Sequence, residues 1–141
     1  MLGRIVKLSS IPVNPDAGLL VLRVLVFLIL FVKHGWEKVF TFSAVVARVP
    51  DFLHIGVAPM IFLAAISDVL CAFLLVFGLA TRWACAWSFV VLFVAWSLRD
   101  HFSFLGRGGD HGELTVLYLA VLIAVFITGP GRYSIDACIK D

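Results

Sequence analysis

The sequence predicts an all-α fold, a four-helix transmembrane bundle with a short interfacial helix between spans one and two. Hydrophobic residues make up 62% of the 141 residues and charged residues only 14%, whereas soluble domains average about 45–50% and about 25%. The mean hydropathy is +1.10. One span needs about 20 apolar residues, so four spans and their connections occupy nearly all of residues 1–141. We therefore expect a single integral membrane domain with no attached catalytic domain.

Four apolar runs define the expected spans, and the residues beside them indicate where each helix begins and ends. Pro15 and Asp16 favour the first turn of a helix. Pro59 opens the second run, and Gly129 and Pro130 end the fourth. The spans cover about residues 17–34, 59–79, 83–98 and 113–128.

The connections between these runs differ in length and polarity. Residues 36–58 contain Lys38 and Arg48 among apolar residues, so they are too charged to span and predict a short helix at the membrane interface. Only residues 80–82 join spans two and three, which predicts a tight antiparallel hairpin. A polar, glycine-rich loop, residues 99–112, precedes span four.

Four spans place both termini on the same side of the membrane. Basic residues divide evenly between the two sides, but Arg4 and Lys7 precede span one and favour a cytoplasmic position for the termini. The net charge is only +2, with no run of Lys or Arg, which argues against nucleic acid as a partner. The lipid bilayer is the expected partner.

Small residues recur at helical spacing on spans three and four. Such ridges let helices approach closely, so we expect both to face other helices rather than lipid. The ridges are Ala84, Ser88 and Ala95 on span three, and Ala120, Ala124 and Thr128 on span four.

Two charges lie in the expected spans away from the span ends, Arg23 and Asp68. Each costs about 2.5–3.5 kcal/mol at the centre of a membrane helix, so each needs a reason. Asp68 shares its helix face with small residues and should point into the bundle. The depths of the two charges differ by about 10 Å, which the Arg23 side chain largely bridges. A buried ion pair that fixes helix register, a ligand- or proton-binding role, and snorkelling of Arg23 to the interface are the alternatives.

A second polar group gathers at the end of the bundle away from the termini. His34 lies eleven residues after Arg23, about three turns, so both lie on one helix face. Glu113 begins span four, where a carboxylate also favours the helix dipole, and the histidines are alternatively ordinary interfacial residues. No metal-ligand spacing and no catalytic motif occurs. The candidate ligand-binding residues are Arg23, His34, Lys38, Asp68, His101, Glu113 and Tyr118.

Several of these residues belong to stretches that resemble a known family. The stretches are Arg23, His34-Gly35-Trp36-Glu37-Lys38-Val39-Phe40, Gly78-Leu79-Ala80-Thr81-Arg82, Gly112-Glu113-Leu114 with Leu117-Tyr118, and Gly129-Pro130-Gly131-Arg132-Tyr133-Ser134-Ile135-Asp136. In this order they resemble the DoxX family of small four-helix bacterial membrane proteins, over about residues 17–136. The family usually has a glutamate in helix two, where this chain has the shorter Asp68.

The resemblance implies a bacterial cytoplasmic (inner) membrane protein linked to sulfur and redox metabolism, similar to membrane subunits of thiosulfate:quinone oxidoreductase. The leading expectation is a subunit of an oxidoreductase complex, non-catalytic or quinone-binding, that binds a quinone or similar lipophilic small molecule. Arg23 and Asp68 would form the floor of its pocket. With no covalently bound cofactor, electrons would come from a redox partner protein, and a second copy of the chain is a further partner to test.

Two other functions are compatible with the same residues. One is a non-enzymatic membrane anchor or assembly factor, in which the interior charges only fix the bundle. The other is a small proton-coupled transporter, in which one intramembrane carboxylate exchanges protons and substrate. The effect of a neutral residue at position 68 distinguishes them, since only the transporter loses a pH-dependent flux.

Overall fold

The computed structural model describes residues 14–99 and 112–139, and all regular elements in these ranges are helices. The predicted all-α class is therefore confirmed for the described residues. The elements are α2 (Pro15–Leu30), η1 (Phe31–Gly35), α3 (Trp36–Phe40), α4 (Phe42–Arg48), α5 (Val57–Ala65), η2 (Ile66–Cys71), α6 (Ala72–Phe77), α7 (Thr81–Arg99), α8 (Gly112–Thr128) and α9 (Ile135–Ile139).

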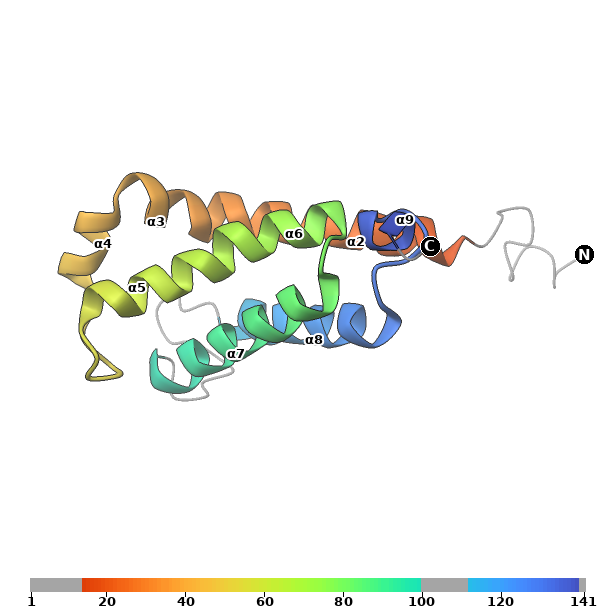
Figure 1. Cartoon of the computed structure of the whole chain (residues 1–141). Coiled ribbons are helices and arrows are strands. Elements are labelled where there is room, and N and C mark those ends of the chain that lie inside the picture. Colours follow the sequence, from red (N-terminus) through yellow and green to blue (C-terminus); the bar gives the residue numbers. More distant parts are fainter. Residues whose placement is uncertain (1–13, 100–111, 140–141) are drawn as a thin grey trace, which may run out of the picture.

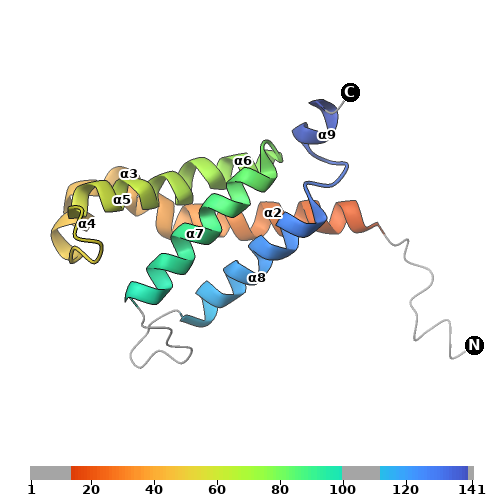
Figure 2. The ribbon, with the colours of Figure 1, turned by 60° about the horizontal axis from the view of Figure 1, so that its bottom comes forward.

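Two long helical rods lie side by side, and each contains a π-helical segment. The first rod is α2–η1–α3 and the second is α5–η2–α6, with η1 in contact with η2 and α2 in contact with α6 (Figure 1). Helices α7 and α8 pack against each other and cross the rods obliquely (Figure 2). The start of α2, the α6–α7 turn and α9 lie at one end of the molecule, and α4 lies at the other.

The helix ends follow from local residues, as predicted. The side chain of Asn14 accepts a hydrogen bond from the backbone N–H of Ala17 at 3.1 Å, which caps α2 with Pro15 in its first turn. Gly78 ends α6 with φ of +68°, a left-handed conformation that side chains with a Cβ rarely adopt. Gly129, with φ of +79°, follows α8 in the same way. Helix α5 begins at Val57, so Pro59 lies within its first turn rather than before it.

Two helices in the described ranges are long and apolar enough to cross a membrane. They are Val57–Phe77, with 21 residues, and Thr81–Leu98, with 18 residues. Helix α8 is apolar but shorter. Residues 36–58 do not form a span: Trp36–Phe40 continue the first rod as α3, and Phe42–Arg48 form the short helix α4. The predicted position of a short helix at the membrane interface stays a prediction.

The core is small and apolar, and the outer surface is apolar as well. The most buried apolar side chains come from α2, α6, α7 and α8: Phe27, Leu30, Leu75, Cys85, Leu122 and Val125, each no more than 1% exposed. Large apolar side chains are exposed on the same helices, among them Val21, Leu25, Phe62, Phe73 and Ile127. An apolar exterior of this extent is typical of a surface that contacts lipid or a partner.

The two small-residue ridges have different outcomes. Ala84 and Ser88 are buried, which confirms the inner part of the ridge on α7, while Ala95 is exposed. On α8 the prediction is wrong for the single chain, since Ala120 and Ala124 are both exposed. The reason is that α8 presents larger residues to the core, so its contact with α7 does not need its alanines.

Candidate functional site

Asp68 is buried in the second rod and forms an ion pair with the first. Its carboxylate is in the π-helical segment η2, and the residue is 3% exposed. The Nζ atom of Lys38, in α3, donates a charge-assisted hydrogen bond to its Oδ2 atom. Lys38 is partly buried, so its stem lies along apolar surface while its ammonium group reaches Asp68. The pair holds a charge that would otherwise be unpaired in the interior.

The two π-helical segments bring Lys38 and Asp68 together. Where η1 meets η2, a Cβ added to Gly35 would lie 3.0 Å from the backbone O of Asp68 and 3.2 Å from Cγ2 of Val69. A larger residue at position 35 would require these neighbours to move by a few tenths of an ångström, so glycine favours the close approach of the rods at this point. Lys38 lies three residues further along the first rod, close to one helical turn from Gly35. Such π segments often occur at functional sites.

Arg23 does not pair with Asp68, so the alternative of a buried ion pair between these two residues is wrong. Arg23 is 0% exposed, and its Nη2 atom donates a hydrogen bond to the backbone O of Tyr133 at 2.7 Å. Its Nε and Nη1 atoms have no hydrogen-bond partner among the described residues. The partner comes from the C-terminal segment after Gly131, which folds back over this end of the bundle. The sequence prediction compared the depths of Arg23 and Asp68 along spans one and two, and the C-terminal segment belongs to neither span.

The C-terminal segment is fastened to the α6–α7 turn by Asp136. Its Oδ1 atom accepts a hydrogen bond from the backbone N–H of Ala80 at 2.7 Å. Its Oδ2 atom accepts hydrogen bonds from the backbone N–H and the hydroxyl of Thr81, at 2.9 and 2.8 Å. The backbone N–H of Asp136 donates to the carbonyl O of Gly78 at 2.9 Å. Asp136 thus caps the first turn of α7 from outside the helix.

These contacts also set the charge state of Asp136. Partial burial raises the pKa of its carboxyl, but the hydrogen bonds from Thr81 and Ala80 and the nearby Arg23 charge outweigh burial. The pKa of Asp136 therefore lies below its ordinary value. The sequence reasoning did not select Asp136 as a functional residue. The only available signal was its place at the end of the Gly129–Asp136 stretch in the family resemblance.

A cavity of about 610 Å³ lies between α3, α4, α5 and α7. Its polar lining residues are His34, Glu37, Lys38 and Arg48, all from the first rod and α4. Glu37 and Arg48 approach each other, with 3.7 Å between Oε1 and Nη1. The rest of the lining is apolar and includes Trp87. The cavity therefore has a charged side and an apolar side, as a site for an amphiphilic molecule requires.

The structure brings together some of the predicted site residues and separates others. His34 and Lys38 line the cavity, and Asp68 touches it only through Lys38. Tyr118 is 8% exposed and belongs to the apolar core. Glu113 lies exposed in the first turn of α8. Neither Tyr118 nor Glu113 is among the residues that line the cavity.

His101 and Arg48 differ in how the structure bears on their predicted positions. His101 lies outside the described residues, so its predicted place at the pocket mouth stays a prediction. Arg48 lines the cavity although the sequence reasoning treated it only as a charge that prevents residues 36–58 from spanning. A basic residue in a segment expected at an interface was the available signal.

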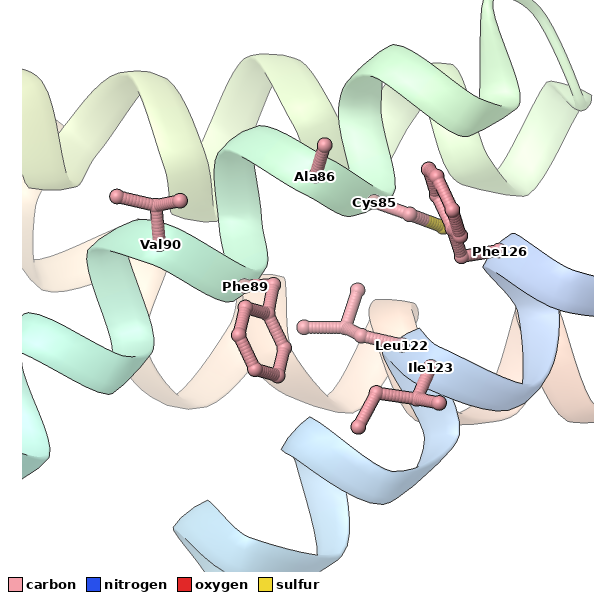
Figure 3. Close-up of a pocket in the computed structure, with 7 residues that line it drawn as sticks. All are labelled: Cys85, Ala86, Phe89, Val90, Leu122, Ile123 and Phe126. Carbon is pink, nitrogen blue, oxygen red and sulfur yellow. The ribbon is translucent and has the colours of Figure 1, made fainter.

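A second, smaller hollow lies between α7 and α8. It has a volume of about 240 Å³ and is lined by Cys85, Ala86, Phe89 and Val90 on α7, and by Leu122, Ile123 and Phe126 on α8. Figure 3 shows the sulfur of Cys85 directed toward the ring of Phe126 across the gap between the helices. We call this hollow the α7–α8 groove. None of its lining side chains carries a charge.

The distribution of charge and the comparison with known families identify the class of protein. Charged groups such as Arg23 and Asp68 are buried, large apolar residues are exposed, and two helices are long enough to cross a bilayer. These features define an all-α membrane protein. The family model for DoxX matches residues 18–102 of the 141-residue chain. The chain belongs to the DoxX family. No curated protein and no solved structure matches it.

Proposed function

We propose that this protein is a membrane subunit of a redox system, in which the cavity beside α3 and α4 binds a quinone or a similar lipophilic small molecule. The observation that supports the proposal most directly is the asymmetric lining of the cavity. Three residues that can donate hydrogen bonds to carbonyl oxygens, His34, Lys38 and Arg48, lie on one side, and apolar residues form the opposite wall. A quinone head with a hydrocarbon tail matches both sides.

The chemistry of such a site is limited to binding and proton handling. A bound quinone accepts two electrons and two protons when it is reduced. Lys38 and Arg48 would orient its oxygens, and the imidazole of His34 would pass protons. Neither the sequence nor the cavity lining contains a cofactor-binding motif, so we infer that the electrons come from a redox partner protein.

The proposal includes a position in the membrane. The protein would lie in the bacterial inner membrane and cross it four times, with both termini in the cytoplasm. Support comes from the two rods, α7 and α8. Among the described residues, the second rod and α7 each contain a helix long enough to span. The start of α2 and α9 lie at the same end of the molecule (Figure 1), which an even number of spans requires.

Quinone binding can be measured with the tryptophans of the protein. We would titrate the full chain in lipid nanodiscs with a ubiquinone that carries one isoprenoid unit and follow tryptophan fluorescence, because Trp87 lines the cavity. We expect saturable quenching in the wild type and at least tenfold weaker binding for Arg48→Met. Arg82→Met is the control, since Arg82 is exposed in the first turn of α7 and does not line the cavity. Unsaturable quenching in the wild type would contradict the proposal.

A small proton-coupled carrier is the second candidate, and the buried pair of Lys38 and Asp68 favours it. A carboxylate that is buried beside a cavity is a typical feature of proton-coupled transport. In proteoliposomes with an imposed pH gradient and an entrapped pH-sensitive dye, the carrier predicts a proton flux that Asp68→Asn abolishes. A non-enzymatic anchor predicts neither a proton flux nor saturable quinone quenching. Its binding to a partner protein should be retained in Arg48→Met and in Asp68→Asn.

A further inference from the structure

We propose that the ligand is a long-tailed amphiphile, whose polar head occupies the charged side of the cavity and whose hydrocarbon tail lies in the α7–α8 groove. This inference rests on the proposed function and adds a class of ligand and a place for its tail. It assigns a role to Cys85, Phe89 and Phe126, which take no part in binding the head.

The two hollows share a lining residue. Val90 belongs both to the cavity and to the α7–α8 groove. It is 57% exposed and lies near the middle of α7, so its side chain forms a ridge between two open hollows rather than a buried wall. Figure 3 shows Val90 at one end of the groove and Phe126 at the other. A flexible chain that leaves the cavity can therefore pass over Val90 into the groove.

The chemistry of the two hollows is complementary. Charged residues line the cavity only from the first rod and α4, while the groove is lined by aliphatic and aromatic residues and the thiol of Cys85. Cys85 is 1% exposed, so the groove offers little to a polar group. A hydrocarbon chain matches this lining, whereas a charged or hydrogen-bonding group would lose its partners there.

The length of the route favours a long tail over a short one. Leu98 lines the cavity and Cys85 lines the groove, and the helical rise over these 13 residues of α7 is about 20 Å. The hydrocarbon core of a bilayer is about 30 Å thick, so one leaflet is about 15 Å. The route along α7 is thus longer than one leaflet, and the exposed side chains of Val90 and Phe126 mark where a tail can enter the groove from the bilayer.

The test compares tail lengths in a variant that fills the groove. Two probes with the same ubiquinone head would be titrated into nanodiscs, one with a single isoprenoid unit and one with a ten-carbon tail, at matched concentrations in the membrane. We expect Ala86→Phe to weaken binding of the long-tailed probe at least tenfold and to leave binding of the short-tailed probe within twofold of the wild type. Ala120→Phe is the matched control, because Ala120 is exposed on α8 outside the groove.

The outcomes separate this inference from the proposed function. If the short-tailed probe binds the wild type and Ala86→Phe weakens both probes equally or neither, the tail does not use the groove and the inference is overturned while the proposed function stands. If neither probe binds the wild type with saturation, the proposed function fails and the inference fails with it. Retained binding of the short-tailed probe also shows that Ala86→Phe is folded.

Discussion

The ion pair between Lys38 and Asp68 is the contact on which the charged side of the cavity depends. Asp68 is almost fully buried, and Lys38 both lines the cavity and holds the carboxylate. A buried charge that loses its partner is strongly unfavourable, whereas removal of both charges together is often neutral. The same lysine therefore links the stability of the two rods to the electrostatic potential that a ligand meets.

Mutation of either residue alone should destabilise the protein more than mutation of both. We expect Lys38→Met to lower the free energy of unfolding by about 3–5 kcal/mol, since it leaves the buried Asp68 charge unpaired. Asp68→Asn should lower it by less, since the Lys38 charge that it leaves unpaired is only partly buried. The double variant should recover at least half of the summed loss, which a double-mutant cycle measures as a coupling energy. Thermal unfolding in one detergent, followed by circular dichroism, would give the four values.

The exposed pair of Glu37 and Arg48 is the control for this cycle. Its atoms are 3.7 Å apart and both side chains are largely exposed, so we expect a coupling below about 1 kcal/mol. Simple additivity of the Lys38 and Asp68 effects would contradict the coupling. In that case Lys38 would not stabilise the buried charge of Asp68, and the charge would need another partner.

At the scale of the helical elements, the contact between η1 and η2 depends on a glycine. We predict that Gly35→Ala lowers the melting temperature and weakens quinone binding, because the new Cβ would lie 3.0 Å from the backbone O of Asp68 and push the rods apart. Gly18→Ala in α2 is the matched control, since nothing lies within 4 Å of its added Cβ. Alanine at that position should be neutral or stabilise the helix by up to about 1 kcal/mol.

The two glycine variants would be compared by thermal unfolding and by titration with the short-tailed ubiquinone. Equal melting temperatures for Gly35→Ala and Gly18→Ala would show that the rods tolerate the added methyl group. In that case the close approach of η1 and η2 would not be the reason for glycine at position 35.

The C-terminal segment should give the protein an acid-sensitive contact at the α6–α7 turn. Because the pKa of Asp136 is lowered in the folded protein, its contribution to stability is present above the ordinary aspartate pKa and is lost as pH falls through the lowered value. We expect the melting temperature of the wild type to fall more steeply below about pH 4 than that of Asp136→Asn. At neutral pH the variant should be less stable by about 1 kcal/mol, as for a lost helix cap.

Melting temperatures at several pH values would test this linkage. Asp16→Asn is a useful comparison, because Asp16 binds the same segment through the backbone N–H of Arg132 at 3.0 Å, without bonds to the start of α7. Parallel pH profiles for the wild type and Asp136→Asn would show that the folded and unfolded states hold the Asp136 proton equally.

The helices were predictable from the sequence because local residues define their ends. Asn14, Gly78 and Gly129 act within one turn of the helix that they begin or end, and a helical run has a simple apolar signature. The partner of Arg23 was not predictable in this way. It is a backbone carbonyl 110 residues away, and backbone groups carry no signal in the sequence.

The candidate site was predictable in part for the same reason. His34 and Lys38 were selected because they lie at one end of the first apolar run, and both line the cavity. The pairing of Lys38 with Asp68 depends on two π-helical segments that each change the helical register. Lys38 lies outside the expected span 17–34, so the sequence prediction compared Asp68 only with Arg23, the charge in span one away from the span ends.

At the scale of the whole molecule, the exterior is apolar as well as the core, and a few polar and charged groups lie buried between them. Arg23, Ser67, Asp68 and Ser88 are buried, while large apolar residues cover the outside. Lipid stabilises such an exterior, and the interior charges then need partners from within the chain. The described termini of the helical region lie at one end and the cavity lies toward the other, so the proposed orientation determines which side of the membrane the head of a ligand approaches.

This orientation can be tested with the native cysteines. Cys138 is exposed, whereas Cys71 and Cys85 are buried, so a membrane-impermeant maleimide should report on Cys138. In intact bacteria we expect no labelling of Cys138, and full labelling after permeabilisation, because the terminal end would face the cytoplasm.

The opposite end is tested by Ile55→Cys in a Cys138→Ser background, since Ile55 is 53% exposed in the α4–α5 connection, and it should label in intact cells. Labelling of Cys138 alone from outside would reverse the orientation. Labelling at both positions in intact cells would place residues 55 and 138 on the same side of the membrane. That result would contradict the proposed four spans, because three of them lie between these two residues.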